Sequence, residues 1–287
     1  MPAIDISFIE REREAYHHAL ITQGLLVITP SGWPSNADAS DNVSKQYATH
    51  VANALGARHD NRLKAQTLGT KYEIITKEFL DKTLSQLSEL LPGEWNVKRN
   101  GIKLTDYKQF YHLKDIKKEA DDSDIIKIVL GEDYYVKPDL VVYREPFSDS
   151  FISAPADCSN FTERLLKSAH KKKSYLHADI SLKWTIRSDR TQNTRTEAQN
   201  IIRNRNGRVP HMIAITCEPL PSRIASLALG LGDLDCVYHS CMHELMDAAT
   251  ALQVNGKAFQ QSYKLLKAMI DGHRLKDISE LPLDLLD

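Results

Sequence analysis

Residues 176–186 read LHADISLKWTI, and this stretch decides the class of fold. Its apolar and polar residues alternate, which is the two-residue period of a β-strand. The apolar set lies on one face: Ile180, Leu182, Trp184 and Ile186. The polar set lies on the other: Asp179, Ser181, Lys183 and Thr185. The stretch therefore predicts a strand with a lysine in its middle.

A second strand is predicted at 134–143, YYVKPDLVVY, which is rich in β-branched and aromatic residues. Pro138 indicates an edge or a local bend, and Asp139 stands in the middle of this apolar run. An acid or a lysine buried in a strand is either paired or functional. Asp139 and Lys183 are thus either an ion pair between two strands or the centre of an active site.

The rest of the chain alternates between the periods of helices and strands. Helices are predicted at 43–55, 70–91, 113–130, 195–204, 222–229, 241–253 and 258–270. Further strands are predicted at 94–98, 211–217 and 234–238. This order favours an α/β fold with a mixed central β-sheet flanked by helices. Because neither a linker nor a repeat interrupts the chain, we expect 1–287 to be a single domain.

The composition is that of an ordinary globular protein, with 42% hydrophobic and 26% charged residues. A net charge of -1 argues against a protein that coats DNA without specificity. A transmembrane helix is not expected, because the sequence has no apolar run of about 18 residues. The four cysteines form no CxxC pair, and charges stand where a signal peptide would be apolar. We therefore expect reduced thiols, no zinc site and a cytoplasmic protein.

Positive charge is concentrated in residues 187–208, which hold six arginines, two acids and no lysine. A charge run of this kind is often only a solvated helix face. Arginine without lysine favours DNA, because the planar guanidinium pairs with guanine and phosphate. The arginines are Arg187, Arg190, Arg195, Arg203, Arg205 and Arg208.

The spacing of Pro138-Asp139, Ser181 and Lys183 resembles the PD-(D/E)xK signature of the restriction-endonuclease fold. Ser181 departs from that signature, which has a carboxylate two residues before the lysine. In the CCGG family of type II restriction endonucleases, a glutamate on the following helix replaces this carboxylate. Glu197, fourteen residues after Lys183, matches it, and Ser181 is then a polar neighbour of the metal shell.

The resemblance to the CCGG family covers most of the chain. The segment 181–197, SLKWTIRSDRTQNTRTE, is the most specific match. Other matching segments are SNAD (35–38), QTLGTKYE (66–73), WNVK (95–98), RNRNGRVPH (203–211), EPLPSRIASLALG (218–230) and KDISELPLDLL (276–286). The resemblance implies an Mg²⁺-dependent enzyme that cuts both strands of duplex DNA, leaving four-base 5′ overhangs.

The resemblance also implies roles for the catalytic residues. Asp139, Glu197 and the main-chain carbonyl of Leu182 are expected to bind Mg²⁺, a hard cation that prefers oxygen. Glu73 is expected to complete the metal shell directly or through water, although an acid near a helix N-terminus is also stabilised by the helix dipole. Lys183 is expected to contact the cleaved phosphate and the attacking water, as a charge or as a base.

The segment that follows the strand 176–186 holds three residues that match those that read CCGG in the family: Arg187, Asp189 and Arg190. Two arginines suit two guanines, and an aspartate accepts from cytosine N4. A surface salt cluster is the alternative interpretation.

The outer base pair has its own candidate readers. Asp38, Gln66 and Arg223 match family positions that read a flanking G·C pair, which predicts GCCGGC as the site. Each also has an ordinary alternative: a turn cap, a loop amide and a helix N-terminal charge.

Two other functions remain open at this point, besides a purely structural protein with internal ion pairs. A repair nuclease of the same fold would have no use for Arg187–Arg190. A regulator that binds DNA without cutting it would leave the carboxylates unexplained. Cutting both strands of a palindrome requires at least a dimer, and the family resemblance implies a tetramer.

Overall fold

The computed structural model describes residues 5–90, 93–115, 136–146, 173–230 and 232–286. In these residues one six-stranded sheet has the order β1-β2-β3-β4-β5-β6. The strands are β1 (Trp95–Arg99), β2 (Leu140–Arg144), β3 (Tyr175–Lys183), β4 (His211–Thr216), β5 (Cys236–His239) and β6 (Leu275–Asp277). β1, β2 and β3 are antiparallel, whereas β3 to β6 are parallel. The predicted mixed α/β fold is therefore confirmed.

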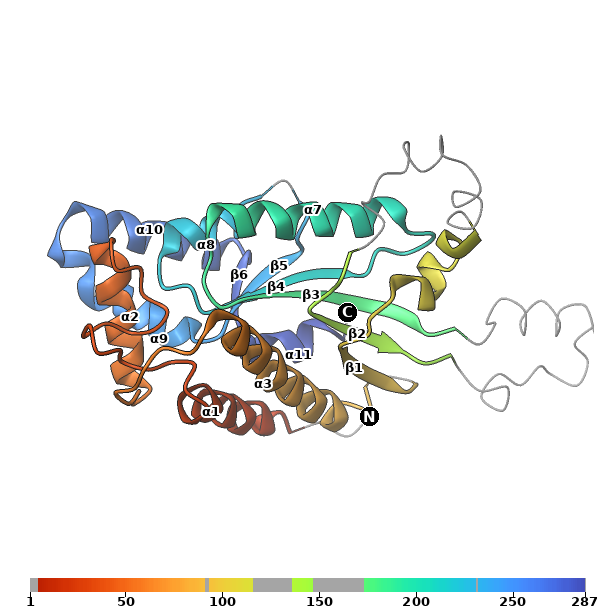
Figure 1. Ribbon diagram of the computed structural model, residues 1–287, viewed down its shortest axis with the longest axis horizontal. Coiled ribbons are helices and arrows are strands. Elements are labelled where there is room, and N and C mark those ends of the chain that lie inside the picture. Colours follow the sequence, from red (N-terminus) through yellow and green to blue (C-terminus); the bar gives the residue numbers. More distant parts are fainter. Residues whose placement is uncertain (1–4, 91–92, 116–135, 147–172, 231, 287) are drawn as a thin grey trace, which may run out of the picture.

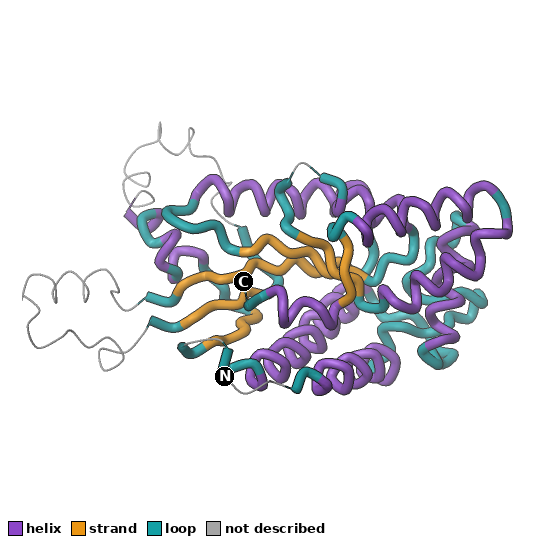
Figure 2. The backbone as a smooth tube through the Cα atoms, turned by 180° about the vertical axis from the view of Figure 1, so that it is seen from behind, coloured by secondary structure: helices purple, strands orange, loops and turns teal. Residues whose placement is uncertain are grey.

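Helices cover both faces of the sheet. Figure 1 shows α7 on one face and α3 with α1 on the other, and Figure 2 shows the same layers from behind. The α2 helix packs on α9, and α10 packs on both α8 and α9. The helices are α1 (Ser7–Thr22), α2 (Asn42–Ala54), α3 (Ala65–Gln86), α7 (Ser188–Asn204), α8 (Pro221–Ala228), α9 (Met242–Leu252), α10 (Lys257–Asp271) and α11 (Leu281–Asp284).

The strand predicted at 134–143 is shorter in the structure, because β2 begins only after Pro138-Asp139. Proline has no N–H to give to a sheet, so a strand tends to start after it. The prediction that Asp139 and Lys183 lie in mid-strand is wrong, since Asp139 precedes β2 and Lys183 is the last residue of β3. Because β2 and β3 are antiparallel, the two positions lie at the same end of the strand pair.

Two helices start earlier than predicted. The helix expected at 70–91 begins at Ala65, and the one expected at 195–204 begins at Ser188. Glu197 therefore lies in the interior of α7 and not near its start, as the predicted helix 195–204 implied. Of the remaining elements, α1, α11 and β6 were not predicted, and the helix expected at 113–130 lies largely outside the described residues.

The central strand β3 is buried on both faces. On its apolar face, Trp184 just beyond the strand meets Tyr72 of α3 edge-on, with ring centroids 5.2 Å apart. On its polar face, Ser181 lies under α7, with its Oγ 3.4 Å from the Thr194 hydroxyl. Asp179 and Ser181 are only 5% and 7% exposed, so the polar side chains of this strand are enclosed.

Candidate active site and DNA cleft

Asp139 and Lys183 are in direct contact. The Oδ2 atom of Asp139 accepts hydrogen bonds from the Lys183 ammonium at 3.0 Å and from the main-chain N–H of Leu182 at 2.7 Å. Both side chains keep some exposure, 28% for Asp139 and 19% for Lys183. The pair is thus fixed by the β2–β3 junction but still open to a ligand.

Two further carboxyl groups lie near this pair, between α7 and the polar face of β3. The pKa of Glu197 is raised, mainly by burial. The charge of Lys183 opposes this rise, and the charge of Asp139 adds to it. Burial also raises the pKa of Asp179 well above its usual value, and the charges of Glu197 and Asp139 add to this. Asp179 Oδ1 is buried without a hydrogen-bond partner. Three acids and one lysine therefore share one small region, which is short of positive charge.

A hollow of about 580 Å³ lies between α3 and the end of β3, and we call it the catalytic pocket after the predicted catalytic residues that line it. Five of the predicted site residues line it: Glu73, Leu182, Lys183, Arg187 and Glu197. Glu73 is held by Arg99, whose Nε donates to Glu73 Oε2 at 2.7 Å. Glu73 is therefore brought to the site from α3, already paired with a cation.

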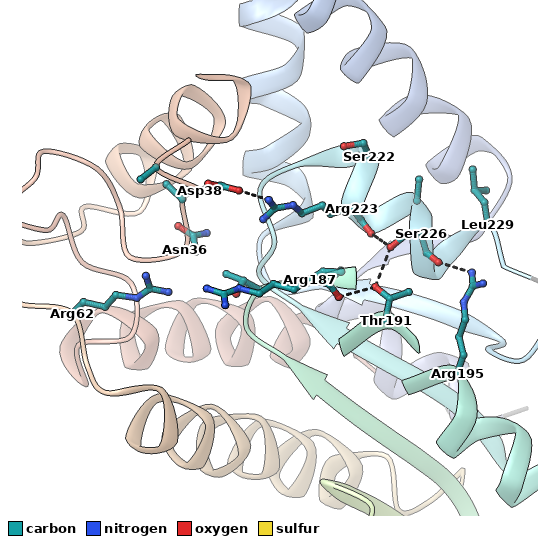
Figure 3. A pocket seen from close by; sticks show the side chains of 15 residues that line it. Asn36, Asp38, Arg62, Arg187, Thr191, Arg195, Ser222, Arg223, Ser226 and Leu229 are labelled. Carbon is teal, nitrogen blue, oxygen red and sulfur yellow. Dashed lines mark hydrogen bonds and ion pairs between the residues drawn. The ribbon is translucent and has the colours of Figure 1, made fainter. Parts of the chain in front are cut away.

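A second hollow has a volume of about 900 Å³, and we call it the reading pocket after the predicted base readers that line it, Asp38, Arg187 and Arg223. It shares Arg62, Thr185 and Arg187 with the catalytic pocket, so the two adjoin. Figure 3 shows Arg62 and Arg187 pointing toward one another and the Asp38 carboxylate facing Arg223. The two hollows together form a continuous cleft with arginines at its centre.

Asp38 has two partners. Its Oδ1 accepts from the N–H and hydroxyl of Ser40, and its Oδ2 pairs with Arg223. The hydrogen bonds from Ser40 and the charge of Arg223 lower the pKa of Asp38 to about 2. Asp38 is thus both a turn cap and one half of an ion pair in the cleft.

Three candidate readers are less well placed by the structure. Asp189 and Arg190 belong to the first turn of α7, but their side chains lie outside the described part of the chain. Gln66 is exposed in the first turn of α3 and lines neither of the two pockets.

Several cleft residues were not found from the sequence. Arg62 stands in a polar loop that carries no motif. Thr191 bonds Ser226 of α8, with 3.2 Å between the hydroxyl oxygens. Glu218 is fully buried and accepts from the main-chain N–H of Ile186, which lines the reading pocket. Only Glu218 had a visible signal, because it is an acid that directly follows the apolar run 211–217.

A different group of side chains has its potential ligand atoms within 4.8 Å of one another: His17, Cys241 and Glu244. Arg13 donates to both oxygens of Glu244, and His17 Nε2 lies 2.6 Å from the Ser240 carbonyl oxygen. A guanidinium beside the group opposes a cation, and thiol and imidazole do not suit Mg²⁺. This group is therefore unsuited to Mg²⁺.

Nearly the whole chain is similar to one family of known proteins. A family model described as NgoMIV restriction enzyme matches residues 16–286. The chain belongs to the NgoMIV restriction enzyme family. It is 39% identical over 283 residues to the type II restriction enzyme NgoMIV of Neisseria gonorrhoeae, covering 96% of this chain and 97% of that protein.

Family membership makes this chain a type II restriction endonuclease, a site-specific deoxyribonuclease whose substrate is DNA. Enzymes of this type generally depend on a divalent metal. The non-catalytic regulator, the repair nuclease and the structural protein are thereby set aside. Among the described residues of this NgoMIV-family enzyme, no helix is long and apolar enough to cross a membrane.

Proposed function

We propose that this restriction endonuclease requires Mg²⁺, recognises GCCGGC and cuts before the first C of the CCGG core, leaving four-base 5′ overhangs. The observation that carries the proposal is the junction of the two pockets at Arg187. The acids and the lysine lie on one side of this arginine, and the Asp38–Arg223 pair lies on the other. Cleavage and base reading are therefore neighbouring functions of one cleft.

The residues of the catalytic pocket fit Mg²⁺. Asp139, Glu197 and the carbonyl of Leu182 would hold the ion, with Glu73 reaching it directly or through water. These are oxygen donors, which Mg²⁺ prefers. The orphaned oxygen of Asp179 and its raised pKa also indicate a region that lacks a cation. When bound, the metal supplies charge neutralisation at the phosphate and activation of a water molecule.

The protein side chains have separate tasks around the phosphate. Lys183 stands at the end of β3 beside the pocket, where its ammonium would bind a non-bridging phosphate oxygen and orient the water. Asp139 holds that ammonium in place through the bond described above. Ser181 is enclosed under α7 and would fill the space of the missing carboxylate without adding charge.

Sequence reading would be divided between the two pockets. Arg187 and Arg190 would bond the two guanines of each half-site, and Asp189 would accept from cytosine N4. Asp38 and Arg223 would read the outer C and G in the same way, since an aspartate and an arginine together fit one orientation of a G·C pair. Gln66 would reach the minor groove from the start of α3.

The assembly is proposed on the symmetry of the substrate. A palindrome cut on both strands needs two active sites, so at least a dimer is expected, and family resemblance favours a tetramer.

The described parts of the chain share one hydrophobic core, which supports a single domain over 1–287. Three buried free thiols, Cys217, Cys236 and Cys241, and a DNA substrate support a cytoplasmic location.

The test is to digest a sequenced genome with the purified protein in Mg²⁺ and to sequence the fragment ends. Ends that begin with 5′-CCGGC, each preceded by G in the genome, are expected. Ends at RCCGGY would refute the outer-pair assignment, and ends without CCGG would refute the whole assignment. Analytical ultracentrifugation of the protein, with and without duplex, separates dimer from tetramer.

A further inference from the structure

Glu218 connects two segments that meet at the reading pocket. It follows β4 and is 0% exposed. Its Oε2 accepts from the main-chain N–H of Ile186 at 2.8 Å, and its Oε1 accepts from the N–H of Leu220 at 3.1 Å. Ile186 directly precedes Arg187, and Leu220 is the N-cap residue of α8. One side chain therefore ties the segment after β3 to the start of α8.

The same carboxylate also faces Arg223. The NH1 atom of Arg223 lies 3.9 Å from Glu218 Oε2, while NH2 of that guanidinium pairs with Asp38. The backbone of Glu218 is fixed as well, because its carbonyl accepts from His239 Nε2 at 3.1 Å. Glu218 thus contacts Arg223 directly and Arg187 through its neighbour.

A buried carboxylate is costly unless its oxygens are satisfied. Burial raises the pKa of Glu218 to about 7, whereas the two N–H groups and Arg223 lower it. A neutral amide would cost less to bury but would offer only one acceptor oxygen. The carboxylate is the group that can accept from both segments at once and also attract the guanidinium.

We propose that Glu218 is a positioning residue for specificity. It fixes the position of Arg187 relative to Arg223, so that the inner and outer base pairs are read together. The inference rests on the proposed function, because it takes these two arginines as base readers. It adds a residue behind the cleft that touches no DNA. Its loss lets α8 move relative to Arg187, so the outer pair is read poorly while the phosphate chemistry is retained.

The experiment measures kcat/KM on the duplex that the wild-type enzyme prefers and on duplexes with a changed outer pair. Wild-type fragment ends define the preferred pair, so an error in the proposed GCCGGC site appears in the wild type alone. For E218Q we expect the ratio between preferred and changed duplexes to fall by about tenfold or more, because one mismatch is typically worth about that factor. The kcat/KM of E218Q on the preferred duplex should fall by a much smaller factor than the ratio of kcat/KM between the preferred and changed duplexes.

D277N is the matched control. Asp277 is also 0% exposed and accepts main-chain N–H groups from Met242 and Ser279, but it pairs with Arg13 and lines neither pocket. It should lower thermal stability without changing the ratio. A wild-type ratio in folded E218Q, or an equal loss of ratio in D277N, would overturn the proposal. If E218Q does not fold, the same comparison is made with E218D, whose shorter side chain reaches only one N–H; an unchanged ratio there also overturns it.

Discussion

The ammonium of Lys183 donates to the Asp139 carboxylate at 3.0 Å, although the two residues are 44 positions apart in the chain. The antiparallel pairing of β2 with β3 sets this contact, because the start of one strand lies beside the end of the other. The main-chain N–H of Leu182 fixes the same carboxylate oxygen. A lysine that lines the catalytic pocket and the aspartate that contacts it are thereby fixed in place.

Replacing either member of this pair by alanine should abolish cleavage and leave specific binding nearly unchanged. Under the proposed function both act on phosphate and metal, and neither faces a base edge. The expected loss is at least about 10²–10⁴-fold in the cleavage rate. Gel shifts in Ca²⁺, which fills oxygen sites, measure the binding. Lys276→Ala is the control, because Lys276 forms a similarly half-buried ion pair with Asp284 away from both pockets; its cleavage rate should stay normal.

Glu197→Ala should also be nearly inactive, since Ser181 cannot act as a carboxylate ligand. The single change Ser181→Glu should be destabilising, because it adds another acid under α7 next to Asp179 and Glu197. The double change Ser181→Glu with Glu197→Ser keeps the number of acids constant and should recover part of the activity. Single-turnover cleavage and thermal unfolding of all three variants decide this. Normal cutting by Glu197→Ala would remove the glutamate from the metal site.

Arg187→Ala should weaken binding to the specific site far more than binding to random DNA. One guanine contact is worth about 1–3 kcal/mol, and a symmetric dimer loses two. The same result is expected for Arg190→Ala. Titrations with cognate and random duplexes at several salt concentrations separate base contacts from phosphate contacts. Equal weakening on both duplexes would make Arg187 a phosphate contact, and Arg11→Ala on the exposed side of α1 should change neither affinity.

His239 should make folding sensitive to mild acid. Its Nε2 contacts the Glu218 carbonyl and its Nδ1 accepts from the Cys241 N–H, which requires the neutral ring. Burial lowers its pKa from 6.5 to about 4. Below the higher value the unfolded chain takes up a proton that the folded protein refuses, so stability is lost as pH falls from 6.5 toward about 4.

The expected loss from His239 is about 2 kcal/mol between about pH 8 and about pH 5. His239→Gln keeps one donor and one acceptor but does not titrate. Over the same pH range, the free energy of unfolding of this variant should therefore fall by about 2 kcal/mol less than that of the wild type. Urea unfolding of both proteins at the two pH values measures this difference. Identical pH slopes would show that His239 does not titrate on unfolding.

The main features of the fold were present in the sequence. The alternation in 176–186 and the apolar run 211–217 predicted two strands, which the structure confirms as β3 and β4, because side-chain periodicity follows local backbone geometry. The boundaries were less accurate. The strand expected at 134–143 begins only after Pro138-Asp139. The α7 helix begins seven residues before the expected start at position 195, because polar residues such as Ser188 and Thr191 give no hydrophobic period.

The sequence by itself determined which residue types are present and in what order: an acid and a lysine, then arginines that suit guanine, then a glutamate at the family spacing. Tertiary structure alone decided which of these groups meet. It joined Asp38 to Arg223 across 185 residues, brought Arg62 into the cleft and buried Glu218 between two reading segments. Local patterns cannot specify such contacts, because they depend on how strands pair and how helices pack on the sheet.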